Sequence, residues 1–347
     1  MSPGEKVSTK PRVVALGDPK YVGADFLEEF RKDFDFEVLD ATNRQQTKEM
    51  LPALVAERPV DAFIIRMGTP PYEPFDEDLL KDLLPGCKII TSASAGFNEF
   101  DVDWMTSQNV WFCNTINAVA EATADMAMFL VLAVLRDTTR GERQARDGTW
   151  KANIVPARDP TNLTLGIVGA GAIGKHLARK AAAFNMKTVY HNRRRLPRDE
   201  EERHGLSTYY ATLNELLAAS DVVSISCPLN KQTENLISTA QFAAMKDGGF
   251  LVNTARGPVV DEDALIDALE SGKVTRAGLD VFANEPRIND YFRTSDKVVL
   301  QPHMGGLTDL AFQKSERECF ENIRSLFKTG RPVAPVNEVK QEPAAMP

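Results

Sequence analysis

Short apolar runs alternate with helical patterns along most of the chain. In the first third, four such runs have the length and β-branched or aromatic content of buried strands: Arg12–Leu16, Ala62–Ile65, Lys88–Thr91 and Val110–Cys113. A helical pattern near Phe26–Phe34 follows the first of them. This alternation predicts βαβ units and a parallel sheet.

A second series of the same kind begins at Leu165. A long helical pattern rich in Ala, Leu and Met comes before it, over about Val119–Arg140. The expected strands are Leu165–Val168, Thr188–Tyr190, Val222–Ser226, Phe250–Asn253, Ala277–Leu279 and Val298–Leu300, and a final helix is expected over Asp309–Lys328. The pattern therefore predicts an α/β protein with two series of parallel strands.

Composition narrows the class of protein. A chain of 347 residues is long enough for two domains. The net charge of -8 argues against a nucleic-acid or membrane-surface binder, which needs a basic face. The longest apolar run, Met126–Leu135, has about half of the roughly 20 residues that cross a bilayer. Four scattered cysteines are typical of a reducing compartment, so we expect a cytoplasmic protein, and we expect no metal site.

The residues from Gly169 to Gly174 form a G-x-G-x-x-G motif. Alone this motif is weak, but here it joins an apolar strand to a helical pattern over Lys175–Phe184. The first glycine permits a tight turn, and the second lets the backbone approach a pyrophosphate. The third allows close packing of helix on strand. We therefore expect Gly169, Gly171, Ala172, Ile173 and Gly174 to bind a dinucleotide at the helix N-terminus.

The end of the next strand distinguishes NADP from NAD. NAD-binding turns carry an acid there, which accepts a hydrogen bond from the ribose 2′-hydroxyl. In this chain Asn192 occupies that place, and Arg193, Arg194 and Arg195 follow. Arginine pairs well with a 2′-phosphate, whereas an acid would repel it. A solvated basic loop is the alternative, but the missing acid favours NADP.

Three charged or titratable residues follow predicted strands: His303 and Glu285 could take part in proton transfer, and Arg256 could bind an anion. His303 follows the strand ending at Leu300, Arg256 the strand ending at Asn253, and Glu285 the strand ending at Leu279. Open α/β sheets bind ligands at the carboxyl ends of their strands. A carboxylate beside an imidazole favours its protonated form, which can act as a proton donor. Each residue could instead have only a structural role. His303 could be a histidine that is hydrogen-bonded within the protein, Arg256 could belong to an internal ion pair, and Glu285 could be an acid exposed to solvent.

In this order and spacing the motifs resemble the D-isomer-specific 2-hydroxyacid dehydrogenases over roughly residues 12–331. The resemblance rests on four stretches: Gly169–Gly174, Val252–Gly257, Gly278–Phe282 leading to Glu285-Pro286, and Pro302–Gly306. It implies a Rossmann dinucleotide-binding domain, 118–308, inserted in a flavodoxin-like substrate domain of 1–117 plus 309–347. It also implies an active site in the cleft between the domains and a homodimer with the helix near Val119–Arg140 in the interface.

The resemblance further implies roles for individual residues. Arg256 would bind the carboxylate and keto oxygen of the substrate, His303 would be the general acid in reduction, and Glu285 would pair with His303. The turn of Ala95, Gly96 and Phe97 would bind the substrate carboxylate through backbone N–H groups. Further cofactor contacts would come from Thr123, Cys227, Pro228, Thr254, Ala255 and, at the nicotinamide carboxamide, Asp280.

The substrate class stays open at this point. The Asn-Arg-Arg-Arg turn resembles NADPH-dependent glyoxylate/hydroxypyruvate reductases, whereas the N-terminal region and the Ala95-Gly96-Phe97 turn resemble fungal D-mandelate dehydrogenases and sugar-acid reductases. We expect NADPH-dependent reduction of glyoxylate, hydroxypyruvate, an aromatic 2-keto acid or a 2-keto sugar acid such as 2-ketogluconate or 2-ketogulonate. The alternative is a non-catalytic dinucleotide sensor that resembles the C-terminal-binding corepressors.

Overall fold

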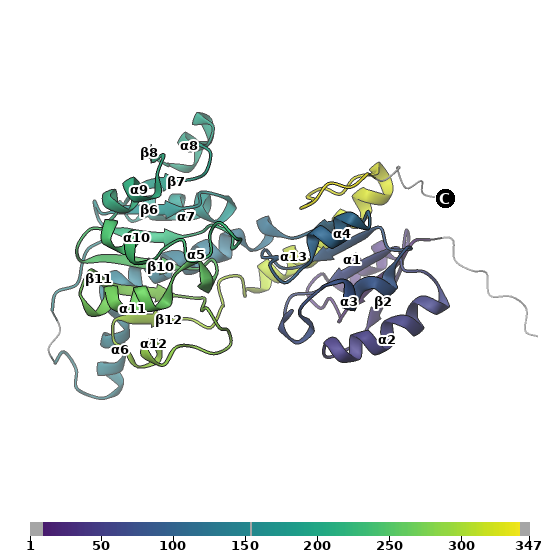
Figure 1. Cartoon of the computed structure of the whole chain (residues 1–347), viewed down its shortest axis with the longest axis horizontal. Helices are drawn as coiled ribbons and strands as arrows, with labels where there is room; N and C mark the ends of the chain where they lie inside the picture. Colours follow the sequence, from purple (N-terminus) through teal and green to yellow (C-terminus); the bar gives the residue numbers. More distant parts are fainter. Residues whose placement is uncertain (1–9, 153–154, 341–347) are drawn as a thin grey trace, which may run out of the picture. The chain divides into compact units, whose positions relative to one another are not determined.

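The computed structural model describes residues 10–152 and 155–340, and these form two compact units (Figure 1). Unit 1 comprises 1–119 and 307–347, and unit 2 comprises 120–306. Each unit is built on one parallel sheet. The expected α/β architecture is therefore confirmed.

Unit 1 holds a five-stranded sheet in the order β2-β1-β3-β4-β5, which is the flavodoxin-like order. Its strands are β1 (Arg12–Leu16), β2 (Asp35–Leu39), β3 (Ala62–Ile65), β4 (Ile89–Ser92) and β5 (Trp111–Cys113). Its helices are α1 (Ala24–Phe30), α2 (Arg44–Glu57), α3 (Glu77–Leu80), α4 (Val102–Ser107) and α13 (Asp309–Thr329), with short 3-10 turns at Pro70–Tyr72 and Lys81–Leu83.

Helix α13 brings the far end of the chain back to unit 1. It packs on β3 and β4, and its Phe320, Ile323 and Phe327 are buried against Ala62 and Ile89 of those strands. The tail after α13 is also attached, because Asn337 accepts from the backbone N–H of Phe112 at 2.8 Å. The returning C-terminal segment thus completes one face of this sheet.

Unit 2 holds a seven-stranded parallel sheet in the order β12-β11-β10-β9-β6-β7-β8. Its strands are β6 (Thr164–Val168), β7 (Lys187–His191), β8 (Thr208–Tyr209), β9 (Val222–Ile225), β10 (Gly249–Asn253), β11 (Val274–Leu279) and β12 (Val298–Leu300). Numbered from β6, the order starts 3-2-1-4-5-6, which is the Rossmann order. The strand order reverses at β6, the strand that carries the glycine motif.

The helices of unit 2 cover both faces of that sheet, and two apolar clusters lie beneath them. They are α5 (Ile116–Arg136, which begins in unit 1), α6 (Thr138–Arg146), α7 (Ala172–Ala183), α8 (Arg198–His204), α9 (Leu213–Ala219), α10 (Thr239–Ala244), α11 (Glu262–Glu270) and α12 (Asp290–Thr294), with a 3-10 turn at Gly257–Val259. Among the described residues, α5 is long and apolar enough to cross a membrane over Asn117–Arg136. However, 67% of its most apolar window is buried, as in the core helix of a globular protein.

One helix expected from the sequence was wrong, and two strands were missed. The helix expected over Val119–Arg140 is two helices, because Asp137 adopts a left-handed conformation (φ 55°) and begins α6. Strands β2 and β8 were missed. Most of β2 is only partly buried, so it lacks a continuous apolar run, and β8 has only two residues.

Candidate active site

The three glycines of the motif meet three different constraints. Gly169 has φ 96°, and a Cβ there would lie 2.8 Å from the backbone nitrogen of Cys227. A Cβ on Gly174 would lie 2.6 Å from the carbonyl oxygen of Gly169, so this glycine lets α7 pack closely on β6. A Cβ on Gly171 would meet nothing within 4 Å. The space beside Gly171 is therefore open for a ligand.

The N-terminus of α7 fits a dinucleotide pyrophosphate. Gly171 is its N-cap and provides no side-chain hydrogen bond to the first turn. The N–H groups of that turn have no partner four residues back and carry the positive end of the helix dipole. Ala172 and Ile173 begin the helix here, so the turn can hold a phosphate through backbone donors.

Asn192 contacts the glycine turn directly. Its Oδ1 accepts a hydrogen bond of 2.7 Å from the backbone N–H of Ala170. This contact was not predicted from the sequence, where Asn192 was considered only as a replacement for an acid. The neutral amide connects the end of β7 to the glycine turn without adding negative charge.

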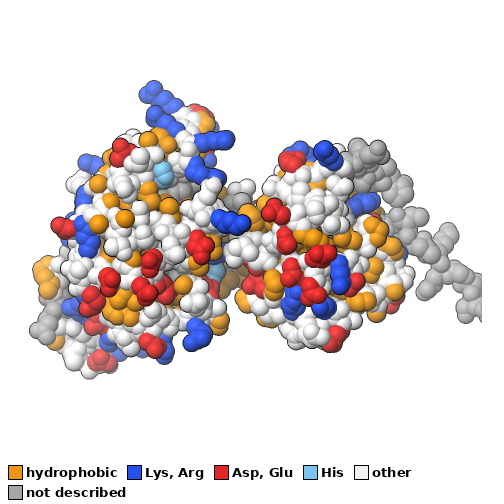
Figure 2. Space-filling view, in the orientation of Figure 1, with side chains coloured by type: hydrophobic (Ala, Val, Ile, Leu, Met, Phe, Trp, Pro, Cys, Tyr) orange, Lys and Arg blue, Asp and Glu red, His pale blue; other side chains and the backbone are white. Residues whose placement is uncertain are grey.

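The three arginines after Asn192 have two different environments. Arg195 makes a two-pronged ion pair with Glu201, at 2.8 and 2.9 Å. The hydroxyl of Tyr190 donates to the same carboxylate, and these bonds hold the pKa of Glu201 at about 2. Arg193 and Arg194 are exposed and make no hydrogen bond or ion pair within the described part of the chain. Figure 2 shows basic side chains gathered on this end of unit 2, around α8.

His303 and Glu285 form a hydrogen-bonded pair. Nδ1 of His303 donates to Oε2 of Glu285 at 2.7 Å, and the other carboxylate oxygen accepts from the backbone N–H of Phe282 at 2.9 Å. Burial raises the pKa of Glu285, but these hydrogen bonds outweigh it and the pKa lies below its ordinary value. An ionised Glu285 keeps the proton on Nδ1 and leaves Nε2 of His303 for another partner.

Asp280 holds the backbone of the loop that carries His303. Its two carboxylate oxygens accept from the N–H groups of Met304 and Gly305 at 2.7 and 2.8 Å. Its carbonyl oxygen also accepts from the N–H of His303 at 2.7 Å. The residue is 1% exposed, and burial raises its pKa. This anchoring role was missed, because the resemblance implied only a contact with the cofactor.

Arg256 lies near the same acid–base pair. A Cβ on the next residue, Gly257, would lie 1.9 Å from the carbonyl carbon of Phe282, so the two loops are in tight contact. The positive charge of Arg256 accordingly helps to lower the pKa of Glu285. Asn253 braces the Arg256 turn, accepting from Ala255 N–H at 3.0 Å and donating to the Arg256 carbonyl at 2.9 Å. The sequence placed Asn253 in a motif but assigned it no role.

The remaining predicted cofactor residues also belong to unit 2. Thr254 is buried, and its hydroxyl has no hydrogen-bond partner among the described residues. Thr123, on α5, approaches Gly305, whose added Cβ would lie 3.2 Å from its methyl carbon. Cys227 precedes Pro228 beside the glycine turn, and burial raises the pKa of its thiol to about 11. An unreactive thiol there is compatible with a purely packing role.

The predicted substrate turn lies in unit 1, at the carboxyl end of β4. Asn114 holds it by donating to the Ala95 carbonyl at 2.6 Å. The backbone N–H groups of Ala95, Gly96 and Phe97 make no hydrogen bond within residues 10–152 and 155–340. Three consecutive unused donors are well suited to bind an anion such as a carboxylate.

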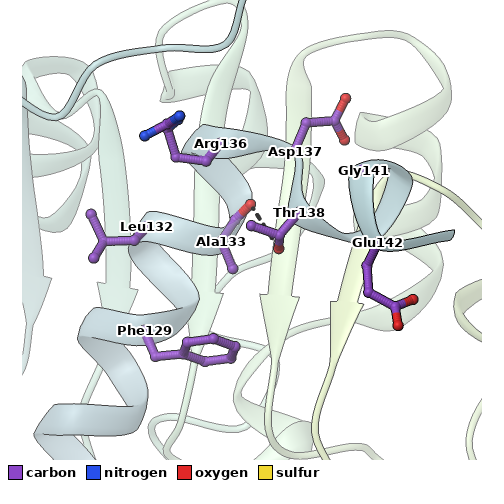
Figure 3. A pocket seen from close by; sticks show the side chains of 8 residues that line it. All are labelled: Phe129, Leu132, Ala133, Arg136, Asp137, Thr138, Gly141 and Glu142. Carbon is purple, nitrogen blue, oxygen red and sulfur yellow. Dashed lines mark hydrogen bonds between the residues drawn. The ribbon is translucent and has the colours of Figure 1, made fainter. Parts of the chain in front are cut away.

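A cavity of about 550 Å³ lies elsewhere in unit 2, along the end of α5 and the start of α6 (Figure 3). It is lined by Phe129, Leu132, Ala133, Arg136, Asp137, Thr138, Gly141 and Glu142. None of the predicted catalytic or cofactor residues is among them. Phe129 is 48% exposed and is one of several large apolar side chains exposed among the described residues.

Comparison with known proteins links these features to one family. Residues 128–305 match the family model of the D-isomer specific 2-hydroxyacid dehydrogenase, NAD binding domain. Dehydrogenase efuE of Hormonema carpetanum is 59% identical over 98% of this chain and 84% of its own length.

Two solved structures are similar over nearly the whole chain. The crystal structure of a glyoxylate reductase from Paecilomyes thermophila has a TM-score of 0.86 at 35% identity, covering 94% of this chain and 98% of that one. The holo form of D-mandelate dehydrogenase from Rhodotorula graminis has a TM-score of 0.87 at 35% identity, covering 95% and 99%.

Proposed function

Because the chain belongs to the D-isomer specific 2-hydroxyacid dehydrogenases, it is an oxidoreductase of small 2-keto or 2-hydroxy acids with a nicotinamide dinucleotide cofactor, and we propose that it is an NADPH-dependent 2-keto acid reductase of the cytoplasm. The hydrogen bond of 2.7 Å between His303 and Glu285 carries this proposal. It provides an oriented proton donor in the same unit as a dinucleotide-type glycine turn. The free state of all four cysteines supports a reducing compartment.

The acid–base step follows from the orientation of His303. NADPH, when bound at the glycine turn, would supply the hydride for the keto carbon, and the carbonyl oxygen would then need a proton. His303 donates that proton from Nε2, while Glu285 accepts the hydrogen bond from Nδ1 and stabilises the positive ring before transfer. Arg256 binds the substrate carboxylate and polarises the keto oxygen, because its fixed charge and planar donors suit both. The N–H groups of Ala95, Gly96 and Phe97 bind the same carboxylate.

The preference for NADPH rests on the end of β7. Arg193 and Arg194 have no partner among the described residues, and no acid stands at the position of Asn192. The 2′-phosphate of NADPH would satisfy both guanidinium groups, whereas the 2′-hydroxyl of NADH would satisfy neither. Thr254, Ala255 and Asp280 would line the nicotinamide end, and Cys227 and Pro228 the adenosine end.

The proposed function is tested by following the oxidation of the nicotinamide cofactor by the purified protein in the presence of 2-keto acids. Turnover is measured with NADPH and with NADH, in each case with glyoxylate, hydroxypyruvate, phenylglyoxylate and 2-ketogluconate as substrates. The configuration of the hydroxy acid product is then determined. We expect turnover with at least one of these acids, a D-2-hydroxy product and a higher kcat/KM with NADPH. Stoichiometric NADPH binding without turnover on a broad panel of 2-keto acids would instead favour a dinucleotide sensor.

The substrate itself follows from the relative rates in this assay. The similarity to a glyoxylate reductase favours the small polar acids, and that to D-mandelate dehydrogenase favours phenylglyoxylate.

A homodimer through the exposed face of α5 belongs to the same proposal, because Phe129 is 48% exposed beside a cavity. Light scattering of the wild type and of Phe129→Glu tests it, with a dimer expected for the first and a monomer for the second.

A further inference from the structure

The segment that links β7 to α8 carries Arg193 and Arg194, which have no partner among the residues that the structure describes. It runs over residues 192–197 and lies beside β8, the edge strand of the sheet in unit 2 (Figure 1). A flexible segment would have to be ordered before it could bind a ligand, and that ordering costs affinity. In this chain the backbone on both sides of the two arginines is attached to the rest of unit 2.

The attachment before the arginines is made by Asn192. Its side-chain oxygen accepts from the backbone N–H of Ala170 at 2.7 Å, and its carbonyl oxygen accepts from the hydroxyl of Tyr209 at 3.2 Å. Tyr209 belongs to β8, which pairs with β7. The residue directly ahead of Arg193 is thus connected both to the glycine turn and to the neighbouring strand.

The attachment after the arginines depends on Tyr190 of β7 and Glu201 of α8. The fully buried Tyr190 accepts from the backbone N–H of Leu196 at 3.0 Å and donates to Glu201 at 2.5 Å. Arg195 donates to the same carboxylate at 2.8 and 2.9 Å. Burial and the hydrogen bond to Glu201 raise the pKa of Tyr190 to about 12, so its hydroxyl remains a donor at neutral pH. The two residues that follow Arg194 are therefore held by one tyrosine and one carboxylate.

Four consecutive acids follow this segment in α8, and all of them are occupied. Each pairs with a cation other than Arg193 and Arg194: Asp199 with Arg203 at 3.4 Å, Glu200 with Lys175 of α7, Glu201 with Arg195 at 2.8 Å, and Glu202 with Arg198 at 3.1 Å. An acid without its own cation would attract Arg193 or Arg194 and would repel a phosphate. The pairing within α8 and around it therefore leaves the charge of these two arginines uncompensated.

We propose that Tyr190, Arg195 and Glu201 form a positioning network that keeps Arg193 and Arg194 unpaired and in a fixed place for the 2′-phosphate of NADPH. This inference rests on the proposed function, in which Arg193 and Arg194 bind that phosphate. Tyr190 fixes the backbone of the segment, and Arg195 neutralises Glu201. The network acts through the two exposed arginines, so it contributes to the discrimination between NADPH and NADH and not to the chemical step.

Tyr190→Phe tests the fixed position without changing any charge. The variant keeps the aromatic ring but removes the hydroxyl that holds Leu196 and Glu201. We expect the Kd for NADPH, measured by fluorescence titration, to rise about 3- to 10-fold, and the Kd for NADH to change less than about twofold. The matched control is Tyr291→Phe, because Tyr291 also donates to a carboxylate, that of Glu270, but on α12 beside β12 at the opposite edge of the sheet. An equal loss for both cofactors would show a merely structural role and would overturn the inference.

Arg195→Gln tests the neutralisation of Glu201. We expect the Kd for NADPH to rise about tenfold, because the uncompensated carboxylate attracts Arg193 and Arg194 and repels the phosphate. The double variant Arg195→Gln, Glu201→Gln removes this carboxylate as well, so its Kd should return to within about threefold of the wild type. If Arg195 itself bound the phosphate, the double variant would bind NADPH no more tightly than the single variant, and the inference would fail.

The wild-type protein separates this inference from the proposed function. If it binds NADPH more tightly than NADH, but Tyr190→Phe and Arg195→Gln leave the ratio of the two Kd values unchanged, only the inference is overturned. If it binds NADH as tightly as NADPH or more tightly, the proposed dependence on NADPH is contradicted and the inference fails with it. Should Tyr190→Phe not fold, Arg195→Gln and its double variant decide the outcome, since the Arg195 side chain is 62% exposed.

Discussion

Two regions at the carboxyl edge of the sheet in unit 2 differ in whether their charged side chains have hydrogen-bond partners within the protein. After β11 and β12, Asp280, Glu285 and His303 are all held by internal hydrogen bonds of 2.7 to 2.9 Å. After β7, only Arg195 is held, while Arg193 and Arg194 have no partner within the described residues. The first arrangement suits chemistry, which needs groups fixed in advance. The second suits anion binding, because unpaired cations have no internal ion pair that must break when an anionic ligand binds.

Removing the imidazole should have the largest effect on this comparison. We expect His303→Ala to lower kcat by about 10²- to 10⁴-fold, because general acid catalysis contributes that much. NADPH binding, measured by fluorescence titration, should persist, since His303 does not contact the glycine turn. His176→Ala is the control, as His176 lies on α7 and hydrogen-bonds to Arg179 at 2.8 Å. Near wild-type turnover of His303→Ala would exclude this residue as the proton donor.

Removing the unpaired cations should affect only the cofactor. We expect the double variant Arg193→Ser, Arg194→Ser to raise the KM for NADPH about 10- to 100-fold, because each charge-assisted hydrogen bond to the 2′-phosphate is lost. The KM for NADH should change little. Arg198→Ser is the matched control, since Arg198 is exposed and already paired with Glu202 at 3.1 Å. Equal changes for both cofactors would contradict the assignment to NADPH.

Asp280→Asn tests whether the preorganised region depends on its buried anchor. An amide can accept from only one of the N–H groups of Met304 and Gly305, and its NH2 group opposes the other. We expect a loss of about 1–3 kcal/mol in unfolding free energy and a kcat about tenfold lower. Asp290→Asn, whose side chain is 90% exposed, is the control.

The same variant separates two roles for Asp280. If it positions His303, kcat falls and the KM for NADPH is nearly unchanged. If it binds the nicotinamide carboxamide instead, the KM for NADPH rises with little change in kcat. A variant that matches the wild type in stability and in both constants would exclude both roles.

The smallest effect is expected for the ion pair between Arg195 and Glu201, close to the end of β7. Glu201 has a folded pKa of about 2 against an ordinary value of 4.5, so its ionisation stabilises the folded protein. That contribution is complete above about pH 4.5 and is lost as the pH falls towards 2. We expect Glu201→Gln to lower the Tm by about 2–4 °C at neutral pH, with a difference that shrinks on acidification. Glu202→Gln is the control, and a pH-independent difference would contradict this origin.

Much of the fold could be predicted from local pattern. Strands β1, β3 and β12 lie at the expected residues, because strands covered on both faces form continuous apolar runs. The half-exposed β2 and the two-residue β8 have no such run. The helix break at Asp137 was also invisible, since the apolar pattern of α5 continues up to it.

The sequence by itself determined the glycine turn, the missing acid at Asn192 and the strand-end positions of Arg256, Glu285 and His303, because these depend on neighbours within a few residues. Only the tertiary structure decided which side chains meet. Asn192 reaches Ala170, and Asp280 holds the loop after β12. These partners are far apart in sequence, and strand order and register bring them to one edge. Local pattern predicts a strand, but it does not specify the strand beside it.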